Sequence, residues 1–249
     1  RRLGETIVVP QTGSVDMTGP LWLAGRLAEF DGGNVVPLIV AVEDRPEALA
    51  RRRAEVEAVR ATLGSLGLPY EPEFRVDRSV AGGVDRVALE QDASLVLLTW
   101  PGPSDLRDLL LGRTNDEIAA AIDRPIALVA LERREYRRVL VALDEDDLAP
   151  GLRPDARMAL ELADRLAAGA PSGVAIGPID LTAAAAKTDE DALPAVDAVV
   201  HLPGPRPIMA WVARHAGPDD IVVVAARGNP FSSVQSAQGT GSAVIAVST

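Results

Sequence analysis

The sequence contains no cysteine and few aromatic residues. The absence of cysteine excludes disulfides, thiolate catalysis and zinc–cysteine sites, and it fits a reducing compartment. Aromatic residues make up 3% of the 249 residues while hydrophobic residues make up 47%, so a core must be built from Ala, Val and Leu. No apolar run approaches the roughly 20 residues that span a bilayer. No signal-peptide pattern occurs either.

Positive charge is also scarce. The chain has 25 Lys and Arg against 36 Asp and Glu, a net charge of -11. Such a surface repels phosphate, which argues against nucleic acid and against direct binding or insertion of this chain in an anionic membrane. The run Arg51, Arg52, Arg53 is interpreted as the solvated face of a helix. The chain begins at Arg1 without Met, so we expect a piece of a longer protein.

Apolar strands alternate with helical patterns through the first half. Short β-branched or wholly apolar runs predict buried strands, and apolar residues at helical spacing predict amphipathic helices between them. This alternation predicts parallel βαβ units in a doubly wound α/β sheet. The predicted strands are 6–9, 35–42, 73–76, 95–98 and 126–131, and the predicted helices are 21–30, 45–66, 79–90 and 115–122.

The same pattern restarts in the second half. SLVLLTWPG aligns with DIVVVAARG, which places Gly102 over Gly228, and an internal repeat of this kind predicts two similar domains. We expect domains 1–134 and 135–249, separated in the charged connector 132–136, each with a five-stranded, mainly parallel sheet. The predicted strands are 137–143, 173–176, 198–202, 221–225 and 243–247, and the predicted helices are 156–166, 181–191 and 208–215.

A glycine-containing loop follows the strand at 95–98. Gly102 and Gly112 enclose nine residues, Thr114 has the character of an N-cap, and Glu117 three residues later completes the spacing of a capping box. A strand, a glycine loop and a helix N-terminus together favour phosphate, because free N–H groups and the helix dipole face the anion.

This stretch resembles the carboxyl end of a universal stress protein domain. Nucleotide-binding members carry Gly, two residues, Gly, nine residues, Gly, then Ser or Thr. Here Thr99 replaces the first glycine, and Arg113 replaces the Ser or Thr, with Thr114 one place late. The stretches RVDRSVAGGVDRVALEQDASLVLLTW and LLLGRTNDEI look most like the tandem universal stress protein region below bacterial monovalent cation:proton antiporters. Tails of amino-acid permeases resemble YRRVLVAL and ALELADRLA about as well.

The resemblance implies an adenine nucleotide as ligand: ATP, AMP or cyclic di-AMP. Phosphates would lie against Gly102, Gly112, Arg113 and Thr114, and adenosine near Pro10, Gln11 and Val42. The family's adenosine-contacting aspartate at the end of the first strand matches Asp144 in the second half.

Other polar groups admit alternative interpretations. The acidic run 144–147 is either a ligand site at a strand end, a magnesium site, or a solvated turn. His201 and His215 lack a third metal ligand, so we expect surface or cap roles. Residues 239–242 are interpreted either as a loop whose backbone N–H groups bind an anion or as a plain loop. Trp22 and Trp211 are expected in the core, and Trp100 either stacks on a base or covers the sheet.

No pairing of general acid with base, no activated nucleophile and no metal-ligand set is evident, so we expect no enzyme. The resemblance implies two tandem domains in an internal pseudo-dimer, regulating an Na+ or K+:proton antiporter. They would lie in the cytoplasm, tethered to the inner face of the membrane by a transporter domain of the same polypeptide, with a homodimer expected. The alternatives are a free-standing stress protein that binds ATP, the tail of an amino-acid permease, and an electron-transfer flavoprotein or hydrolase of the same broad fold.

Overall fold

The computed structural model describes residues 2–11, 16–42, 46–100, 106–131, 134–143, 145–148, 151–178, 199–202, 208–226 and 243–249. The chain divides into two compact units, Arg1–Ala127 and Leu128–Thr249. The division falls inside strand β5 (Ile126–Ala130), a few residues before the connector at which the sequence predicted a boundary. No helix within the described ranges combines the length and the hydropathy needed to cross a bilayer.

The first unit alternates strands with helices as predicted. Val, Ile and Leu fill β1, β2 and β4, and almost every residue of these strands is buried, as in a sheet covered on both faces. The elements before β5 are β1 (Thr6–Pro10), α1 (Thr18–Asp31), β2 (Asn34–Ala41), α2 (Pro46–Leu66), β3 (Glu73–Val76), α3 (Val80–Glu90), β4 (Leu95–Thr99) and α4 (Leu106–Ala121).

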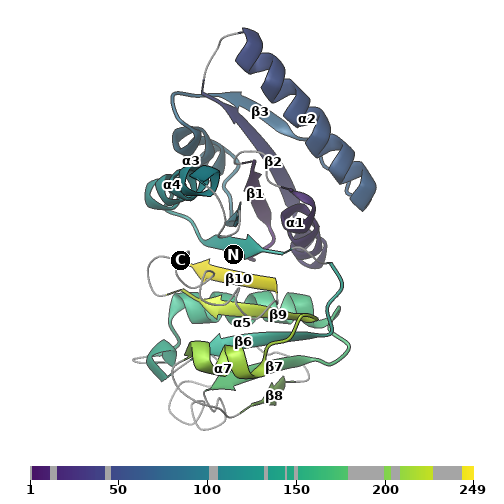
Figure 1. Ribbon diagram of the computed structural model, residues 1–249, viewed down its shortest axis with the longest axis vertical. Helices are drawn as coiled ribbons and strands as arrows, with labels where there is room; N and C mark the ends of the chain where they lie inside the picture. Colours follow the sequence, from purple (N-terminus) through teal and green to yellow (C-terminus); the bar gives the residue numbers. More distant parts are fainter. Residues whose placement is uncertain are drawn as a thin grey trace. The chain divides into compact units, whose positions relative to one another are not determined.

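Helices cover both faces of this unit's strands. Strand β1 pairs in parallel with β2 and with β4, and β2 pairs in parallel with β3. Helices α1 and α2 lie on one face, and α3 and α4 on the other (Figure 1). The helices that follow β1 and β2 lie on one face, and the helices that follow β3 and β4 lie on the other. The position between β1 and β4 is therefore the topological switch point, where open α/β sheets bind ligands.

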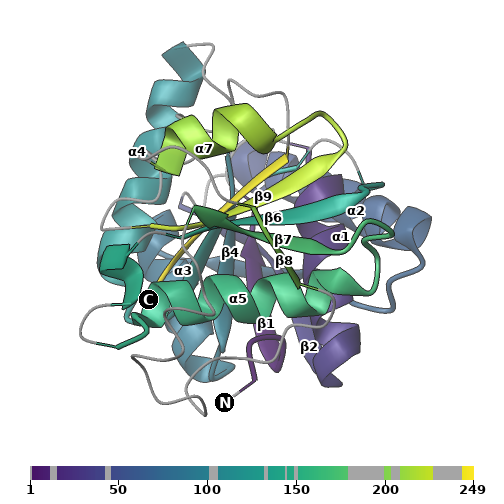
Figure 2. The same cartoon turned by 90° about the horizontal axis from the view of Figure 1, so that it is seen from below.

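The second unit repeats this pattern. Strand β6 pairs in parallel with β7 and β9, β7 with β8, and β9 with β10. Helices α5 and α7 lie on opposite faces of β6 and β7 (Figure 2). The predicted helix 181–191 lies outside the described residues. The elements are β6 (Arg138–Leu143), the 3-10 turn η1 (Glu145–Leu148), α5 (Pro154–Ala167), β7 (Val174–Pro178), β8 (Val199–His201), α7 (Ile208–His215), β9 (Asp220–Ala225) and β10 (Ala243–Ser248).

The α/β fold with a mainly parallel sheet is confirmed, whereas the prediction of two separate five-stranded sheets is not confirmed. Among the described strands, the first half has the order β3-β2-β1-β4-β5 and the second half the order β10-β9-β6-β7-β8.

Candidate functional site

The switch point of the first unit brings three predicted site residues to one edge. Pro10 ends β1 and Thr99 ends β4, and the register that pairs Val8 with Val96 places Gln11 level with Thr99. The Gln11 N–H donates to the carbonyl of Leu38 at 2.8 Å, which ties the end of β1 to β2. Val42 follows β2 and is 45% exposed. Pro10, Gln11 and Thr99 therefore belong to one edge of this unit's strands.

Helix α4 overturns one premise of the phosphate loop. It starts at Leu106, so Gly112, Arg113 and Thr114 lie inside it, and Thr114 is not its N-cap. Inside an α-helix each N–H donates to the carbonyl four residues earlier, which leaves no free N–H to face an anion there. The leucine-rich segment 106–111 favours helix strongly enough to carry it through one glycine. Gly102 lies outside the described residues.

Asn115 is a polar residue that the sequence did not single out. Its side chain is fully buried in α4, and its Nδ2 donates to the Thr99 carbonyl at 3.0 Å. Its Oδ1 is buried and accepts no hydrogen bond. The Thr99 hydroxyl lies 3.8 Å from the Met17 sulfur. Asn115 thus anchors α4 to the carboxyl end of β4 and leaves one buried acceptor beside it. The only signal in the sequence was a weak helix former inside a helical segment.

The corresponding edge of the second unit is acidic. Asp144 itself is outside the described residues, and η1 carries Asp146 and Asp147 directly after β6. Asp146 is exposed, whereas Asp147 is 1% exposed. Burial raises the pKa of Asp147 to about 6; Arg153 opposes this rise, and the carboxylates of Asp146 and Asp155 add to it. The interpretation of this run as a plain solvated turn is therefore wrong for Asp147.

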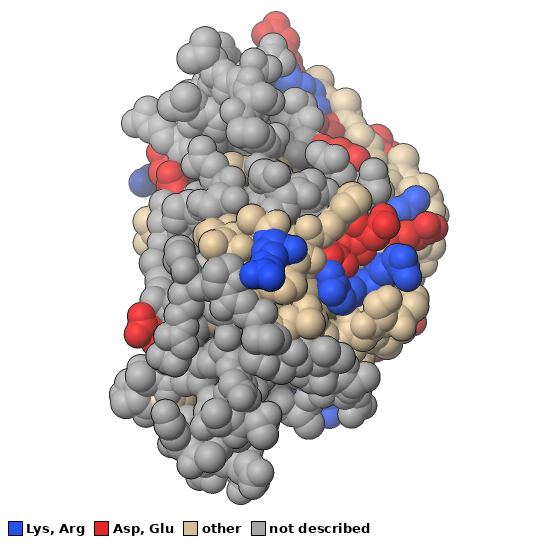
Figure 3. Space-filling view, turned by 60° about the horizontal axis from the view of Figure 1, so that its bottom comes forward, with Lys and Arg blue, Asp and Glu red and all other residues tan. Residues whose placement is uncertain are grey.

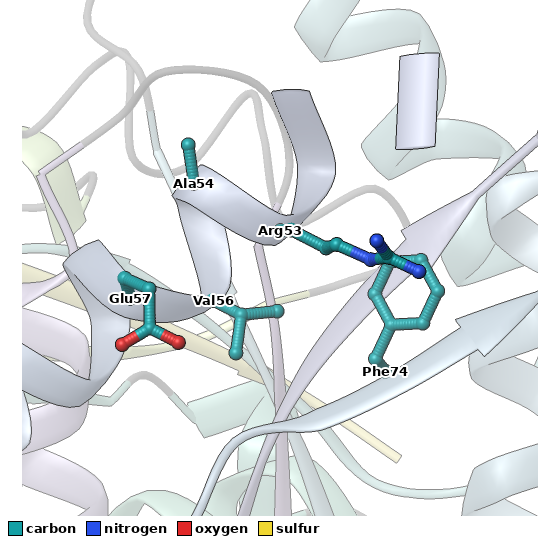
Figure 4. Close-up of a pocket in the computed structure, with 5 residues that line it drawn as sticks. All are labelled: Arg53, Ala54, Val56, Glu57 and Phe74. Carbon is teal, nitrogen blue, oxygen red and sulfur yellow. The ribbon is translucent and has the colours of Figure 1, made fainter. Parts of the chain in front are cut away.

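A pocket of about 410 Å³ lies elsewhere, between helix α2 and strand β3 (Figure 4). Phe74 comes from β3, and Arg53 extends from α2 toward its ring. The remaining lining residues, all on α2, are Ala54, Val56 and Glu57. A single cation and a single carboxylate give this pocket no set of groups for acid–base chemistry.

The basic run of α2 is solvated, as predicted. Arg51 and Arg53 are exposed, and Arg52 donates to Glu55 at 2.6 Å one turn later. Figure 3 shows one face of the molecule, on which blue and red side chains lie next to each other. No basic stripe suited to nucleic acid appears among the coloured atoms of that face.

His215 and Trp211 contact each other in the second unit, whereas Trp22, which was expected in the core, is only half-buried. His215 ends α7, and its Nδ1 lies 3.0 Å from the Trp211 carbonyl. Trp211 is fully buried, and its indole N–H donates to the Leu202 carbonyl at 2.7 Å. The described residues contain no group of three His, Cys, Asp or Glu that could hold a metal. The loop 239–242 is outside the described ranges.

Comparison with known proteins gives one sequence relative at low identity. No protein-family model matches the sequence. The Na(+)/H(+) antiporter NhaS5 of Synechocystis sp. is 26% identical over 145 residues, which is 54% of this chain and 21% of that protein. The chain therefore spans about a fifth of the length of this relative.

Solved structures match nearly the whole chain. A universal stress protein from Archaeoglobus fulgidus has a TM-score of 0.59 at 16% identity and covers 98% of this chain and 96% of its own. The cytoplasmic domain of a prokaryotic cation chloride cotransporter has a TM-score of 0.55 at 12% identity. This match covers 98% of the present chain and 95% of the cotransporter domain. At these identities the likeness shows the fold alone. The predicted resemblance is confirmed at this level: the chain has the fold of universal stress proteins, and part of its sequence is similar to a sodium–proton antiporter.

Proposed function

We propose that this chain is a cytoplasmic regulatory part of a monovalent cation:proton antiporter, attached to a membrane transporter domain of the same polypeptide. The observation that carries the proposal is the similarity to an Na(+)/H(+) antiporter over 145 residues. A second transporter, the cation chloride cotransporter, has a cytoplasmic domain with this fold. We propose a binding role for the chain and no catalytic one.

Regulation of this kind needs two arrangements of the transporter. A ligand of the regulatory part can shift transport only if it binds one arrangement more tightly than the other. A tenfold difference in affinity is worth about 1.4 kcal/mol, enough to change a balanced equilibrium substantially. The regulatory part therefore needs a site whose geometry depends on the state of the transporter.

Transport measurements test this proposal. The reading frame that encodes this chain is expected to encode hydrophobic spans as well. Everted vesicles that contain the full-length protein are compared with vesicles that contain a protein lacking residues 1–249, at equal amounts in the membrane. The truncated protein is expected to exchange cations for protons with an altered rate or pH profile. Unchanged transport, or a reading frame without hydrophobic spans, would contradict the proposal.

We also propose that the two halves are tandem copies of one domain that form an internal pseudo-dimer. The orders β3-β2-β1-β4-β5 and β8-β7-β6-β9-β10 follow the same rule, and helices α1 and α5 both follow the first strand of their half. This topology supports a repeat. Association of two whole chains as a homodimer is a further proposal, which sedimentation equilibrium of the purified chain tests.

An adenine nucleotide is the ligand that we propose for the first half. Adenosine would lie at the switch point near Pro10, Gln11 and Val42. Because the N–H groups of 112–114 lie inside α4, we place the phosphates near Leu106, where the first N–H groups of a helix have no intrahelical partner. Calorimetry with ATP, AMP and cyclic di-AMP tests the ligand, and no heat with any of the three would remove it from the proposal.

Two variants then locate the site. If phosphates lie at the start of α4, Gly112→Asp should weaken binding by less than tenfold, about 1.4 kcal/mol. Complete loss of binding in a folded Gly112→Asp protein would place the phosphates against Gly112 instead. Asp144→Ala should also weaken binding by less than tenfold if the first half holds the ligand. Loss of binding in this variant alone would assign the site to the second half. Circular dichroism checks that both variants fold.

A free-standing stress protein that binds ATP is the second candidate. The match to a universal stress protein over 98% of this chain and 96% of the other favours it. The full reading frame separates the two candidates, because a free-standing protein would be encoded without membrane spans.

A further inference from the structure

Two buried carboxylates lie near the start of helix α5, and one arginine acts on both. Asp147 is 1% exposed and Asp155 is 7% exposed. The Arg153 guanidinium lies 3.2 Å from Asp155 Oδ2, and Arg153 is also the cation that opposes the negative charge at Asp147. Two negative charges and one positive charge at a poorly hydrated position leave an excess negative charge, which is costly to bury.

Asp155 has the hydrogen-bond donors that a carboxylate needs. Its Oδ1 accepts the Thr249 N–H at 2.8 Å and the Thr249 hydroxyl at 2.6 Å, and its Oδ2 accepts from Arg153. It also lies in the first turn of α5, where the helix dipole favours a negative charge. Asp155 is therefore equipped to carry a charge.

Asp147 is the acid whose protonation removes the excess negative charge. Among the described side chains, the charged groups that act on it are Asp146 on its own turn, Arg153 at the N-cap of α5 and Asp155 on α5. Thr249, after the end of β10, adds only neutral donors, and Asp155 uses them. Both burial and the two like charges favour the protonated carboxyl, and the pKa of Asp147 rises to about 6.

The same residue also joins the turn to the helix. The Asp147 carbonyl accepts the N–H of Arg153, the N-cap of α5, at 2.8 Å. Asp155 in turn joins α5 to Thr249. An ionised Asp147 side chain gains hydration by moving toward water, and that movement pulls on the turn whose carbonyl holds the start of α5.

We propose that η1 and the first turn of α5 form a proton-operated latch at the carboxyl edge of the second unit's strands. With Asp147 protonated, the turn packs on α5 and the latch is closed. With Asp147 ionised, the side chain turns outward and η1 releases the N-cap of α5. The proposal does not depend on the transporter role or on nucleotide binding.

Nuclear magnetic resonance on the whole chain tests the latch. The ¹³C-labelled carboxyl of Asp147 is followed from pH 4 to pH 8, together with hydrogen exchange of the Arg153 amide, expressed as a protection factor corrected for intrinsic exchange. We expect the carboxyl to titrate near pH 6, and we expect the protection factor to fall at least about tenfold, or about 1.4 kcal/mol, between pH 5 and pH 7.5.

A pair of variants separates the latch from a general effect of pH. Asp147→Asn is neutral at every pH, so the Arg153 amide should stay protected at pH 7.5. Asp146→Asn is the matched control on the exposed side of the same turn. In this variant the protection factor of the Arg153 amide should still fall as the pH rises, and the midpoint of that fall should lie at a slightly lower pH. Titration of Asp147 below pH 5, or pH-independent protection in the unmodified chain, would overturn the proposal. An Asp147→Asn protein that keeps the full pH dependence would overturn it as well. If that variant fails to fold, the carboxyl titration of the unmodified chain decides.

Discussion

Gly177 shows how closely single residues are packed in the second unit. A Cβ added there would lie 2.5 Å from the Leu202 carbonyl and 2.6 Å from the Trp211 ring. Neither neighbour yields easily, because Trp211 is fully buried and its indole N–H is bonded to that same carbonyl. Gly177→Ala should therefore lower the free energy of unfolding by about 1–3 kcal/mol, as for other overpacked cores. Urea unfolding measures this change.

Gly64 is the matched control for Gly177. It lies in α2 with nothing within 4 Å of an added Cβ. Gly64→Ala should raise stability by up to about 1 kcal/mol, because alanine is the better helix former. If both variants shift the urea midpoint in the same direction, the packing described around Gly177 is wrong.

Asp147 makes the stability of the fold depend on pH in a defined direction. Its pKa is raised from 3.8 to about 6 in the folded chain, so the folded state holds the proton more tightly than the unfolded state. Its stabilising contribution is complete below about pH 4 and is lost as the pH rises through 6. Asp147→Asn should therefore raise the free energy of unfolding at pH 7.5 by up to about 3 kcal/mol, with little gain at pH 4. Urea unfolding at pH 7.5 and pH 4 tests this prediction. An equal change in the free energy of unfolding at the two pH values would contradict it.

At the scale of elements, helix α3 depends on one cap. Ser79 has extended backbone, and its hydroxyl accepts the Gly82 N–H at 3.0 Å, which satisfies one of the free donors at the helix start. Ser79→Ala should cost about 1 kcal/mol, and Ser79→Asp should retain the cap. Thermal unfolding of both variants provides the measurement. Equal losses in the two would mean that the cap contributes nothing.

Helix α2 is attached more weakly than its length suggests. Of its 21 residues only Val59 and Leu63 are buried, whereas α1 buries eight of 14. Since tertiary packing supplies most of the stability of a helix in a protein, α2 should open more readily than α1. Native-state hydrogen exchange is expected to show lower protection in α2. Protection in α2 equal to that of α1 would contradict this.

At the scale of the whole molecule, charge repulsion is the main long-range electrostatic effect. The net charge is -11. Ion pairs such as Arg60 with Glu71 are largely exposed, and such pairs contribute roughly 0–1 kcal/mol. Salt screens both effects, and with 36 acids against 25 bases the repulsion outweighs the pairs. The melting temperature should therefore rise between low and physiological ionic strength. Sodium chloride and tetramethylammonium chloride should act alike, and a fall with either salt would contradict the prediction.

The order of strands and helices could be predicted from the sequence because it depends on local patterns. The bounds of β3 and α7 match the predicted ranges 73–76 and 208–215. The start of α4 was missed because Gly112 and Thr114 look locally like a stop and a cap. Six preceding residues that include four leucines outweigh one glycine, which costs about 1 kcal/mol in a helix.

By itself, the sequence determined the α/β class, the restart of the pattern after the connector 132–136, and the strand ends at which Pro10, Gln11 and Thr99 lie. Only the tertiary structure decided the order of the strands within each unit. It also decided that Asn115 is fully buried, and that Asp147 rather than its neighbour Asp146 is enclosed. Strand and helix patterns repeat over a few residues and can be recognised locally. The burial of Asp147 beside an exposed Asp146 depends on how η1 meets α5, and folding alone brings these two segments together.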